Sequence, residues 1–457
     1  MKPTAPLAAV LAATVAVTVL SATGTASAQE AARGGRHFYG TKTPYAPQER
    51  LKDYQPAPRG FVPVFTENVA RHGSRAMTDG ADGDTVLAVL RRAEEQDALT
   101  GLGRRLGPQV QSLLDAATAL GWGNLSARGA QEHRDTARRL EQRLPGLFDA
   151  IAADHRPIVV ETSGQARAVA SANAFTGALV AGDPALAGLV GAPVTDKDLL
   201  YFHKQPQNAD YRAYLAGDPD LAAVLASIDA EPRAAEAARH TVARLFRADF
   251  AAGLTGDEQV SFARALYQLY SAAPDLRAEA PGVDLDPFLA PPDAQWFAYL
   301  DDAEEFYQKG PGFSGRTITY AMAQVLLDDL FARAEAAAAG TTADGAVLRF
   351  THAEEVEPLA VLLGLPGSTE PAPAGDPYAY RNNPWRGERV APMAANVQWD
   401  VFAGPSGRPG EPVGHLVRML YNERETAFPS TCVPVSAGSH YYELKELERC
   451  FGRGPAA

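Results

Sequence analysis

One stretch constrains the fold of this chain more than any other, because an apolar run leads directly into a cluster of cations. Residues 61–70 are mostly apolar and predict a buried strand, with Pro63 tolerated near its start. Arg71-His72-Gly73-Ser74-Arg75 follows, and Asp84 is placed to cap a helical pattern after a short loop. A strand that ends in a polar loop before a helix is typical of open α/β sheets, where ligands bind beyond the strand ends.

The residue types in this loop suit a phosphate group. Arg71 and Arg75 carry planar, permanently charged donor groups that match phosphate oxygens. A neutral His72 imidazole can attack phosphorus, and Gly73 lets the backbone approach a ligand closely. The alternative is an ordinary arginine-rich loop with a structural histidine, so the rest of the chain has to decide between the two.

The same arrangement of strand, polar loop and helix recurs at residues 157–179. A β-rich segment ends at Ser163-Gly164, and Arg167 falls in the first turn of the helical pattern that follows. A cation there opposes the helix macrodipole unless an anion binds at that end. Arg167 is therefore a candidate phosphate ligand, and a solvent-exposed arginine is the alternative.

A third instance lies near the C-terminal end. Residues 346–351 predict a strand, and His352-Ala353-Glu354 then precedes a helix through Leu362. His352 can bind a phosphoryl oxygen, and Glu354 can protonate a leaving alkoxide if burial raises its pKa. Taken alone, Glu354 is better explained, with Glu355, as part of an ordinary acidic first helical turn. The presence of Arg71–Arg75 elsewhere in the chain favours the functional interpretation.

The segments between these motifs are predicted to be mainly helical. Residues 84–144 predict three helices, with His133 on a solvated charged face of the third. Residues 184–340 are rich in alanine with apolar positions at helical spacing, which predicts an α-helical cap inserted into the sheet domain. We therefore predict an α/β domain, a mixed sheet flanked by helices, in two parts, 29–183 and 341–457.

The last hundred residues contain two alternating runs and the only cysteines. Residues 396–402 and 413–421 predict a hairpin at a sheet edge, and a short helix then ends at Cys450. The N-terminus, described next, predicts that the chain is exported. In an exported chain two nearby cysteines favour a disulfide, here Cys432–Cys450, with two free thiols as the alternative. Their spacing fits no zinc motif, and we expect no metal site.

The N-terminus predicts export. Lys2 is followed by an apolar run at residues 7–20 and by Ala26-Ser27-Ala28, a small-residue cleavage site that predicts a signal peptide over residues 1–28. The run is short for a bilayer span, so we expect no membrane association after cleavage. An uncleaved anchor or a lipoprotein is the alternative, and no cysteine lies near the cleavage site.

The charge balance limits the partners. The 457 residues carry a net charge of -13, which argues against non-specific nucleic-acid binding. A pocket for a polyanion must therefore be locally basic against an acidic background. The oligomeric state does not follow from the sequence.

Together these motifs resemble the histidine acid phosphatases, specifically the multiple inositol polyphosphate phosphatases. Residues 71–75 resemble the signature loop of that family, and Ser163 with Arg167 resembles its downstream phosphate-binding motif. His352-Ala353-Glu354 resembles the proton-donor triplet of the inositol polyphosphate branch. Further similarity lies in residues 41–45, 125–132, 306–312, 396–402 and 417–429.

The resemblance implies a phosphomonoesterase that acts on phytate and lower inositol phosphates without a cofactor. His72 would attack phosphorus, Arg71, Arg75, Arg167 and His352 would bind its oxygens, and Glu354 would protonate the leaving group. Lys42, His203 and Lys204 are candidate contacts to outer phosphates. Two rivals stay open, namely a broad-specificity acid phosphatase and a non-catalytic binder of phosphorylated ligands.

The chain departs from the family pattern at two places. Met77 stands where the family loop usually has proline, and we expect little effect on activity. Residues 199–211 lack the cysteine that family members often carry there. The substrate-facing part of the helical cap is therefore where specificity can differ.

Overall fold

The computed structural model of the protein describes residues 37–405 and 414–453. The predicted signal peptide, residues 1–28, lies outside the described residues. Within the described ranges, none of the helices is both long and apolar enough to span a bilayer.

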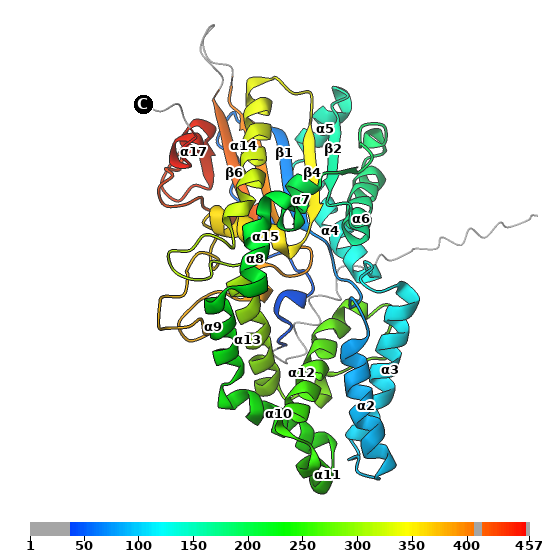
Figure 1. Cartoon of the computed structure of the whole chain (residues 1–457). Helices are drawn as coiled ribbons and strands as arrows, with labels where there is room; N and C mark the ends of the chain where they lie inside the picture. Colours follow the sequence, from blue (N-terminus) through cyan, green and yellow to red (C-terminus); the bar gives the residue numbers. More distant parts are fainter. Residues whose placement is uncertain (1–36, 406–413, 454–457) are drawn as a thin grey trace, which may run out of the picture. The chain divides into compact units, whose positions relative to one another are not determined.

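The described residues form one eight-stranded sheet with the order β3-β2-β4-β1-β5-β6-β7, and β8 pairs with β6. The strands on the β3 side are parallel, whereas β5 runs antiparallel to β1 and to β6. The fold class is therefore the predicted one, a mixed α/β sheet flanked by helices (Figure 1). The strands are β1 Val62–Arg71, β2 Ile158–Thr162, β3 Val194–Thr195, β4 Ala346–Thr351, β5 Asn396–Ala403, β6 His415–Tyr421, β7 Arg424–Thr426 and β8 Tyr441–Glu443.

Helices occupy most of the chain between β1 and β4, as the apolar spacing predicts. The helix predicted from Asp84 begins three residues earlier, so Asp84 lies inside its first turn rather than at its cap. The helices are α2 Ala81–Glu95, α3 Gly103–Leu120, α4 Ala127–Arg143, α5 Pro145–Ala153, α6 Ala166–Gly182, α7 Lys197–Leu200, α8 Ala209–Gly217, α9 Pro219–Asp229, α10 Pro232–Leu245, α11 Ala248–Gly253, α12 Gly256–Ala272, α13 Pro291–Gln308, α14 Gln324–Ala339, α15 Ala353–Leu362, α16 Gly387–Val390 and α17 Leu444–Cys450.

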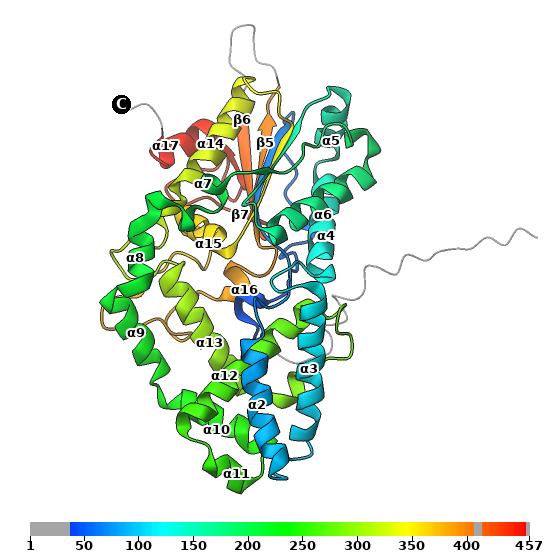
Figure 2. The same cartoon turned by 45° about the vertical axis from the view of Figure 1, so that its right-hand side comes forward.

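Both faces of the sheet are covered by helices (Figure 2). Alternate residues of β4 enter opposite cores: Leu348 packs toward α4, α5 and α6, and Val347 packs toward α14 and α15. Because both faces are buried, the central strands carry apolar residues on both faces, and the polar residues within them, such as Glu67 and Arg349, are buried as well. The long hydrophobic runs at 61–70 and 346–351 follow from this burial.

A third hydrophobic core holds the remaining helices together below the sheet in Figure 1. It contains Leu106 and Leu113 of α3 together with Leu245 of α10 and Phe262 of α12. The residues in this core differ from the predicted cap of residues 184–340. Helices α2 and α3 pack in this core although they precede residue 184, and α14 packs on the sheet although it lies before residue 340.

The predicted hairpin is present, but it does not lie at the sheet edge. Strand β5 pairs with β1 along most of its length, and β6 carries both β7 and β8 on its far side. The disulfide predicted between Cys432 and Cys450 is present, with the two Cα atoms 5.2 Å apart. It ties the segment after β7 to the end of α17.

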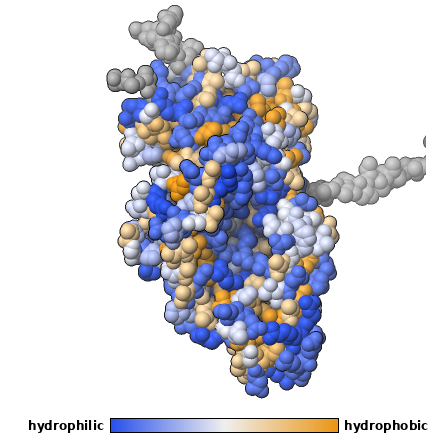
Figure 3. Space-filling model, in the orientation of Figure 1, coloured by the Kyte–Doolittle hydropathy of each residue, from blue (hydrophilic) through white to orange (hydrophobic). Residues whose placement is uncertain are grey.

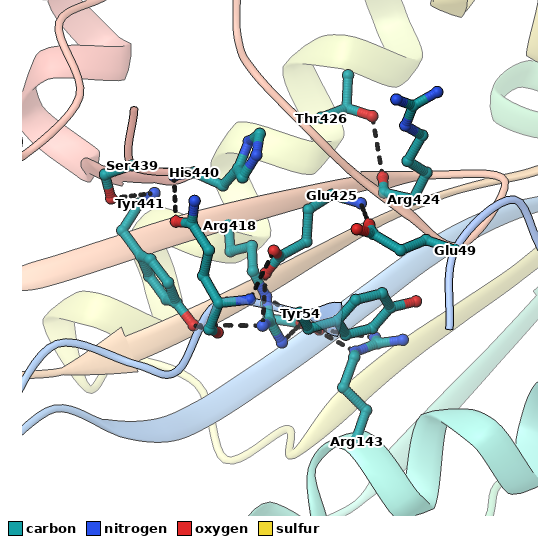
Figure 4. A network of polar contacts seen from close by, with 12 residues as sticks. Glu49, Tyr54, Arg143, Arg418, Arg424, Glu425, Thr426, Ser439, His440 and Tyr441 are labelled. Carbon is teal, nitrogen blue, oxygen red and sulfur yellow. Dashed lines mark hydrogen bonds and ion pairs between the residues drawn. The ribbon is translucent and has the colours of Figure 1, made fainter. Parts of the chain in front are cut away.

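A buried ion network joins β5 and β6 to helix α4 and to strands β7 and β8. Asp400 of β5 accepts hydrogen bonds from Arg143 of α4, at 3.0 Å, and from Arg418 of β6, at 2.8 Å. Figure 4 shows the neighbouring contacts, in which Arg418 also meets Glu425 of β7 and the Tyr441 hydroxyl of β8. The guanidinium of Arg418 therefore connects four strands.

We predict that Asp400→Asn lowers the free energy of unfolding by roughly 3–5 kcal/mol, because buried Arg143 loses its counter-charge and buried Arg418 keeps only Glu425. Burial alone would raise the pKa of Asp400, but Arg143 and Arg418 hold it below its ordinary value. This stabilisation is therefore present above the unfolded-state pKa and is lost as the pH falls through the folded-state pKa.

Urea unfolding at neutral and acidic pH measures both effects. The exposed Asp149→Asn on α5 is the matched control and should unfold as the wild type does. A wild-type-like midpoint for Asp400→Asn at neutral pH would contradict the prediction.

Candidate active site

Three parallel strands bring the three sequence motifs to one edge of the sheet. Arg71 at the end of β1 pairs with Thr351 of β4, and Thr162 at the end of β2 pairs with Phe350 of β4. The backbone N–H of His72 continues the ladder by donating to the Thr351 carbonyl at 2.8 Å. His72, Ser163 and His352 therefore leave neighbouring strands at the same level, as expected for a ligand site of an α/β sheet.

His72 is buried, and its hydrogen bonding fixes which ring nitrogen is reactive. Its Nδ1 lies 2.9 Å from the Gly73 carbonyl oxygen, which can only accept, so the proton sits on Nδ1. Nε2 therefore keeps its lone pair. Burial, followed by the charge of Arg71, holds the pKa of His72 well below its ordinary value, so the ring stays neutral.

The loop after His72 is shaped by close backbone contacts. A Cβ atom on Gly73 would lie 2.5 Å from the Gly129 carbonyl oxygen, so only glycine fits there. The Gly73 N–H donates to the Ser171 hydroxyl at 3.2 Å. Ser74 donates from both its N–H and its hydroxyl to the buried Glu132 carboxylate of α4. These contacts hold the loop between α4 and α6.

Arg71, Arg75 and Arg167 gather around His72. Arg71 is fixed by donation from Nη1 to the carbonyl oxygens of Thr41 and Ala391. Burial and the neighbouring Arg167 lower the pKa of Arg75 to about 10, and burial also lowers the pKa of Arg167. The buried Nε atoms of all three arginines have no hydrogen-bond partner among the described residues. Such a concentration of buried, incompletely paired cations favours an anionic ligand.

His352 stands opposite His72, with 5.4 Å between the ring centroids. The Ser163 hydroxyl accepts from the Gln165 N–H, so its own hydrogen is available to His352 Nε2, 2.8 Å away. A Ser163 hydroxyl that donates to Nε2 leaves the proton of the neutral ring on Nδ1, a buried atom without a partner among the described residues. Burial, followed by Arg167, lowers the pKa of His352 to about 3, so the ring is a neutral donor.

Glu354, in the first turn of α15, is in electrostatic contact with this group. Its charge acts on Arg75, Arg167 and His352. The sequence-based expectation was a pKa raised by burial. Burial does act in that direction, but neighbouring charges outweigh it, the ammonium of Lys309 first among them, and the pKa of Glu354 lies well below its ordinary value. In the ligand-free protein Glu354 is therefore a carboxylate.

The three residues proposed for outer phosphates lie in different surroundings. Lys42, in the short helix η1 (Gly40–Lys42), donates to Gln268 of α12 and lies 3.4 Å from Asp301 of α13. His203, in η4 (Phe202–Lys204), is buried against Glu355, with Nδ1 2.5 Å from Oε1. The side chain of Lys204 is exposed.

The sequence did not single out several residues that shape the site. His133, predicted on a solvated face, is buried edge-on against Phe350, because that face of α4 packs on the sheet. Glu132, next to it, organises the loop after His72. Lys309 and Tyr201 also border the site. They lie in segments 306–312 and 199–211, which are noted above without a role for either residue. Figure 3 shows hydrophilic residues gathered in a hollow between the sheet and the helices below it.

The chain belongs to the histidine phosphatase superfamily (branch 2), whose family model matches residues 65–422. It is therefore an enzyme of the phosphoric monoester hydrolase class. The match begins within β1 and ends just after β6, so it contains the three motifs described above.

The chain is similar to several characterised relatives. The multiple inositol polyphosphate phosphatase of Bifidobacterium longum, crystallised with inositol hexasulfate, is 33% identical, with a TM-score of 0.83 and coverage of 91% of this chain and 97% of that chain. Its complex with phosphate gives 32% identity, a TM-score of 0.85 and the same coverage. The multiple inositol polyphosphate phosphatase 1 of Gallus gallus is 25% identical over 420 residues, covering 88% of this chain and 83% of that protein. The phytase from D. castellii shares the fold, with a TM-score of 0.64 at 15% identity and coverage of 91% of this chain and 84% of that chain.

We predict that Gly129→Ala lowers kcat by about 10²-fold, because a displaced loop misplaces His72. The added Cβ would lie 2.1 Å from the Ser74 carbonyl oxygen, so the loop after His72 must move. Gly146→Ala on α5 is the matched control, since nothing lies within 4 Å of its Cβ position. Steady-state kinetics of phosphate release compare the two, and equal activity of both variants would contradict the prediction.

Proposed function

We propose that the protein is an exported phosphomonoesterase that hydrolyses phytate and other inositol polyphosphates through a phosphohistidine intermediate. The observation that carries this proposal is the arrangement around His72. A neutral imidazole with its Nε2 lone pair available stands among three arginines whose buried Nε atoms have no partner in the described part of the chain. Nucleophile and oxyanion ligands are therefore preorganised around one position.

In the first step, His72 Nε2 forms a bond to phosphorus while the bond from phosphorus to the ester oxygen breaks. The guanidinium groups of Arg71, Arg75 and Arg167 and the Nδ1–H of His352 stabilise the charge on the three equatorial oxygens. The departing alkoxide takes a proton from the Glu354 carboxyl group. The products of this step are a free alcohol and a phosphorylated His72.

Glu354 must hold a proton for this step, although it is ionised in the ligand-free protein. A bound phosphate group adds negative charge beside it and offsets the surrounding cations, which raises its pKa. The proton can arrive with the substrate monoanion or from solvent at acidic pH. In the second step, water attacks phosphorus, Glu354 accepts the proton of that water, and the bond from phosphorus to Nε2 breaks.

The substrate class is supported by the relatives. Two of them are named multiple inositol polyphosphate phosphatases, and one was crystallised with inositol hexasulfate, a polyanion that resembles a fully phosphorylated inositol. The locally basic site in a chain of net charge -13 also suits a small, highly charged anion better than an extended polyanion such as a nucleic acid.

Export is supported by two features at opposite ends of the chain. Residues 1–28 have the pattern of a cleavable leader, and Cys432 and Cys450 form a disulfide, which persists in oxidising compartments.

Two alternatives make different predictions. A broad-specificity acid phosphatase would hydrolyse sugar and aryl phosphates as fast as phytate. A non-catalytic binder would hold phytate tightly without releasing phosphate. The orientation of His72 speaks against the binder, because a phosphate-binding role alone does not require a neutral imidazole among arginines.

We predict that His72→Ala lowers kcat for phosphate release by at least about 10³-fold with the fold intact, because the nucleophile is lost. His240→Ala, on the exposed face of α10, should keep wild-type turnover. Circular dichroism checks the fold. Alkaline quenching of a reaction with radiolabelled substrate should trap phosphate on the wild type alone, and full turnover by His72→Ala would identify another nucleophile.

We predict that Glu354→Gln slows hydrolysis of phytate by roughly 10²–10⁴-fold, because the alkoxide leaving group depends on general acid catalysis. An aryl phosphate, whose leaving group is a weak base, should be affected far less in its first step. Single-turnover rates on both esters measure this difference. Equal slowing of the two would assign Glu354 a different role.

A further inference from the structure

A single lysine lies at the centre of the acidic residues behind the site. Lys309, directly after α13, places its Nζ 2.6 Å from the Glu305 carboxylate and 3.4 Å from Oε1 of Glu354. Its side chain is only 14% exposed. Glu305 and Glu354, two of the three acids around Lys309, raise its pKa well above its ordinary value, against the effect of burial, so it remains a cation.

The third of these acids is neutral. Glu357, one turn after Glu354 on α15, is completely buried, and neither of its carboxylate oxygens has a hydrogen-bond partner in the described part of the chain. Burial and the nearby charge of Glu305 raise the pKa of Glu357 well above its ordinary value. The positive charge of Lys309 is therefore shared by two carboxylates, Glu305 and Glu354.

Other groups also face Glu354, but they are engaged elsewhere or are neutral. His352 is neutral and hydrogen-bonded to Ser163, and His203 is bound to Glu355. Arg75 and Arg167 carry the phosphate-binding role proposed above. The groups in electrostatic contact with Glu354 in the described part of the chain include Lys309 after α13, His203 in η4, His352 and Glu355 and Glu357 at α15, Arg167 on α6, Arg75 in the loop after β1, and Tyr201 and Tyr211.

We propose that Lys309 is a positioning residue of the catalytic site, whose ammonium group, anchored by Glu305, fixes the orientation of Glu354 and keeps it a carboxylate until substrate binds. This inference rests on the proposed function, because it assigns a partner to the proposed general acid. Lys309 faces Oε1, so Oε2 is the oxygen left for the leaving group and for the attacking water. The cation also makes the protonated form of Glu354 a strong acid at the moment of transfer.

The test is the pH profile of kcat for Lys309→Met on phytate and on an aryl phosphate. Removal of a cation within 4 Å should raise the pKa of Glu354 in the substrate complex. The alkaline limb on phytate should then move to higher pH by about 1–3 units. The limb on the aryl phosphate should stay in place, since that ester needs little protonation of its leaving group. Lys309→Arg should restore the wild-type limb, and the exposed Lys445→Met on α17 should not move it.

Two further variants keep the proposal testable if Lys309→Met folds poorly. Glu305→Gln removes a competing anion and should shift the alkaline limb on phytate in the opposite direction, to lower pH. The double variant Lys309→Met/Glu305→Gln lacks both the cation and its anchoring carboxylate, so Glu305 is not left as an unpaired charge. Its alkaline limb on phytate should lie at higher pH than that of Glu305→Gln alone.

The outcomes distinguish a failure of the Lys309 assignment from a failure of the proposed function. If kcat falls by one factor at every pH and on both esters, Lys309 has only a structural role and the proposal is overturned. A wild type that releases phosphate from neither ester would refute the proposed function itself, and the assignment of Lys309 with it. A shifted limb on phytate alone, restored by arginine, supports both.

Discussion

The site depends on three parallel strands being held in one register, and a buried arginine connects all three. Arg349, in the middle of β4, is fully buried, with Nη1 2.9 Å from Glu67 of β1 and Nε 3.4 Å from Glu161 of β2. Asp329 of α14 is its third partner. A shift of one strand would leave these charges unpaired in the core, which is costly, so the network favours one register. That register sets His72, Ser163 and His352 side by side.

The electrostatics of the site follow from placing cations and histidines together out of water. Burial, reinforced by the arginines, keeps His72 neutral, and burial with Arg167 does the same for His352. The backbone carbonyl of Gly73 then fixes the proton of His72 on Nδ1, and donation from the Ser163 hydroxyl places the proton of His352 on its own Nδ1. One imidazole is thereby left with a lone pair and the other with a hydrogen-bond donor. The partner of His72 is the next residue in the chain, whereas the partner of His352 lies far from it in the sequence.

The three glutamates at the start of α15 differ in pKa and in partners although they lie close together. Burial without partners raises the pKa of Glu357, whereas the ammonium of Lys309 helps hold the pKa of Glu354 below its ordinary value. Glu355, between them in sequence, is bound to His203 and to the Thr351 hydroxyl. Three glutamates within one turn of α15 thus have three different environments. Their roles are set by what packs against each face of the helix, not by their spacing.

The sequence alone determined the local elements and the chemistry of the three motifs. Apolar runs that end in Arg71–Arg75, in Ser163 and in His352–Glu354 could be recognised as strand ends, since strand and helix periodicities are local properties of the chain. The parallel sheet then brought these motifs together. The sequence could not show that His133 is buried, that α2 and α3 pack with α10 and α12, or that Lys309 lowers the pKa of Glu354. Burial and charge at a residue are sums over neighbours distant in sequence, so only the tertiary structure decides them.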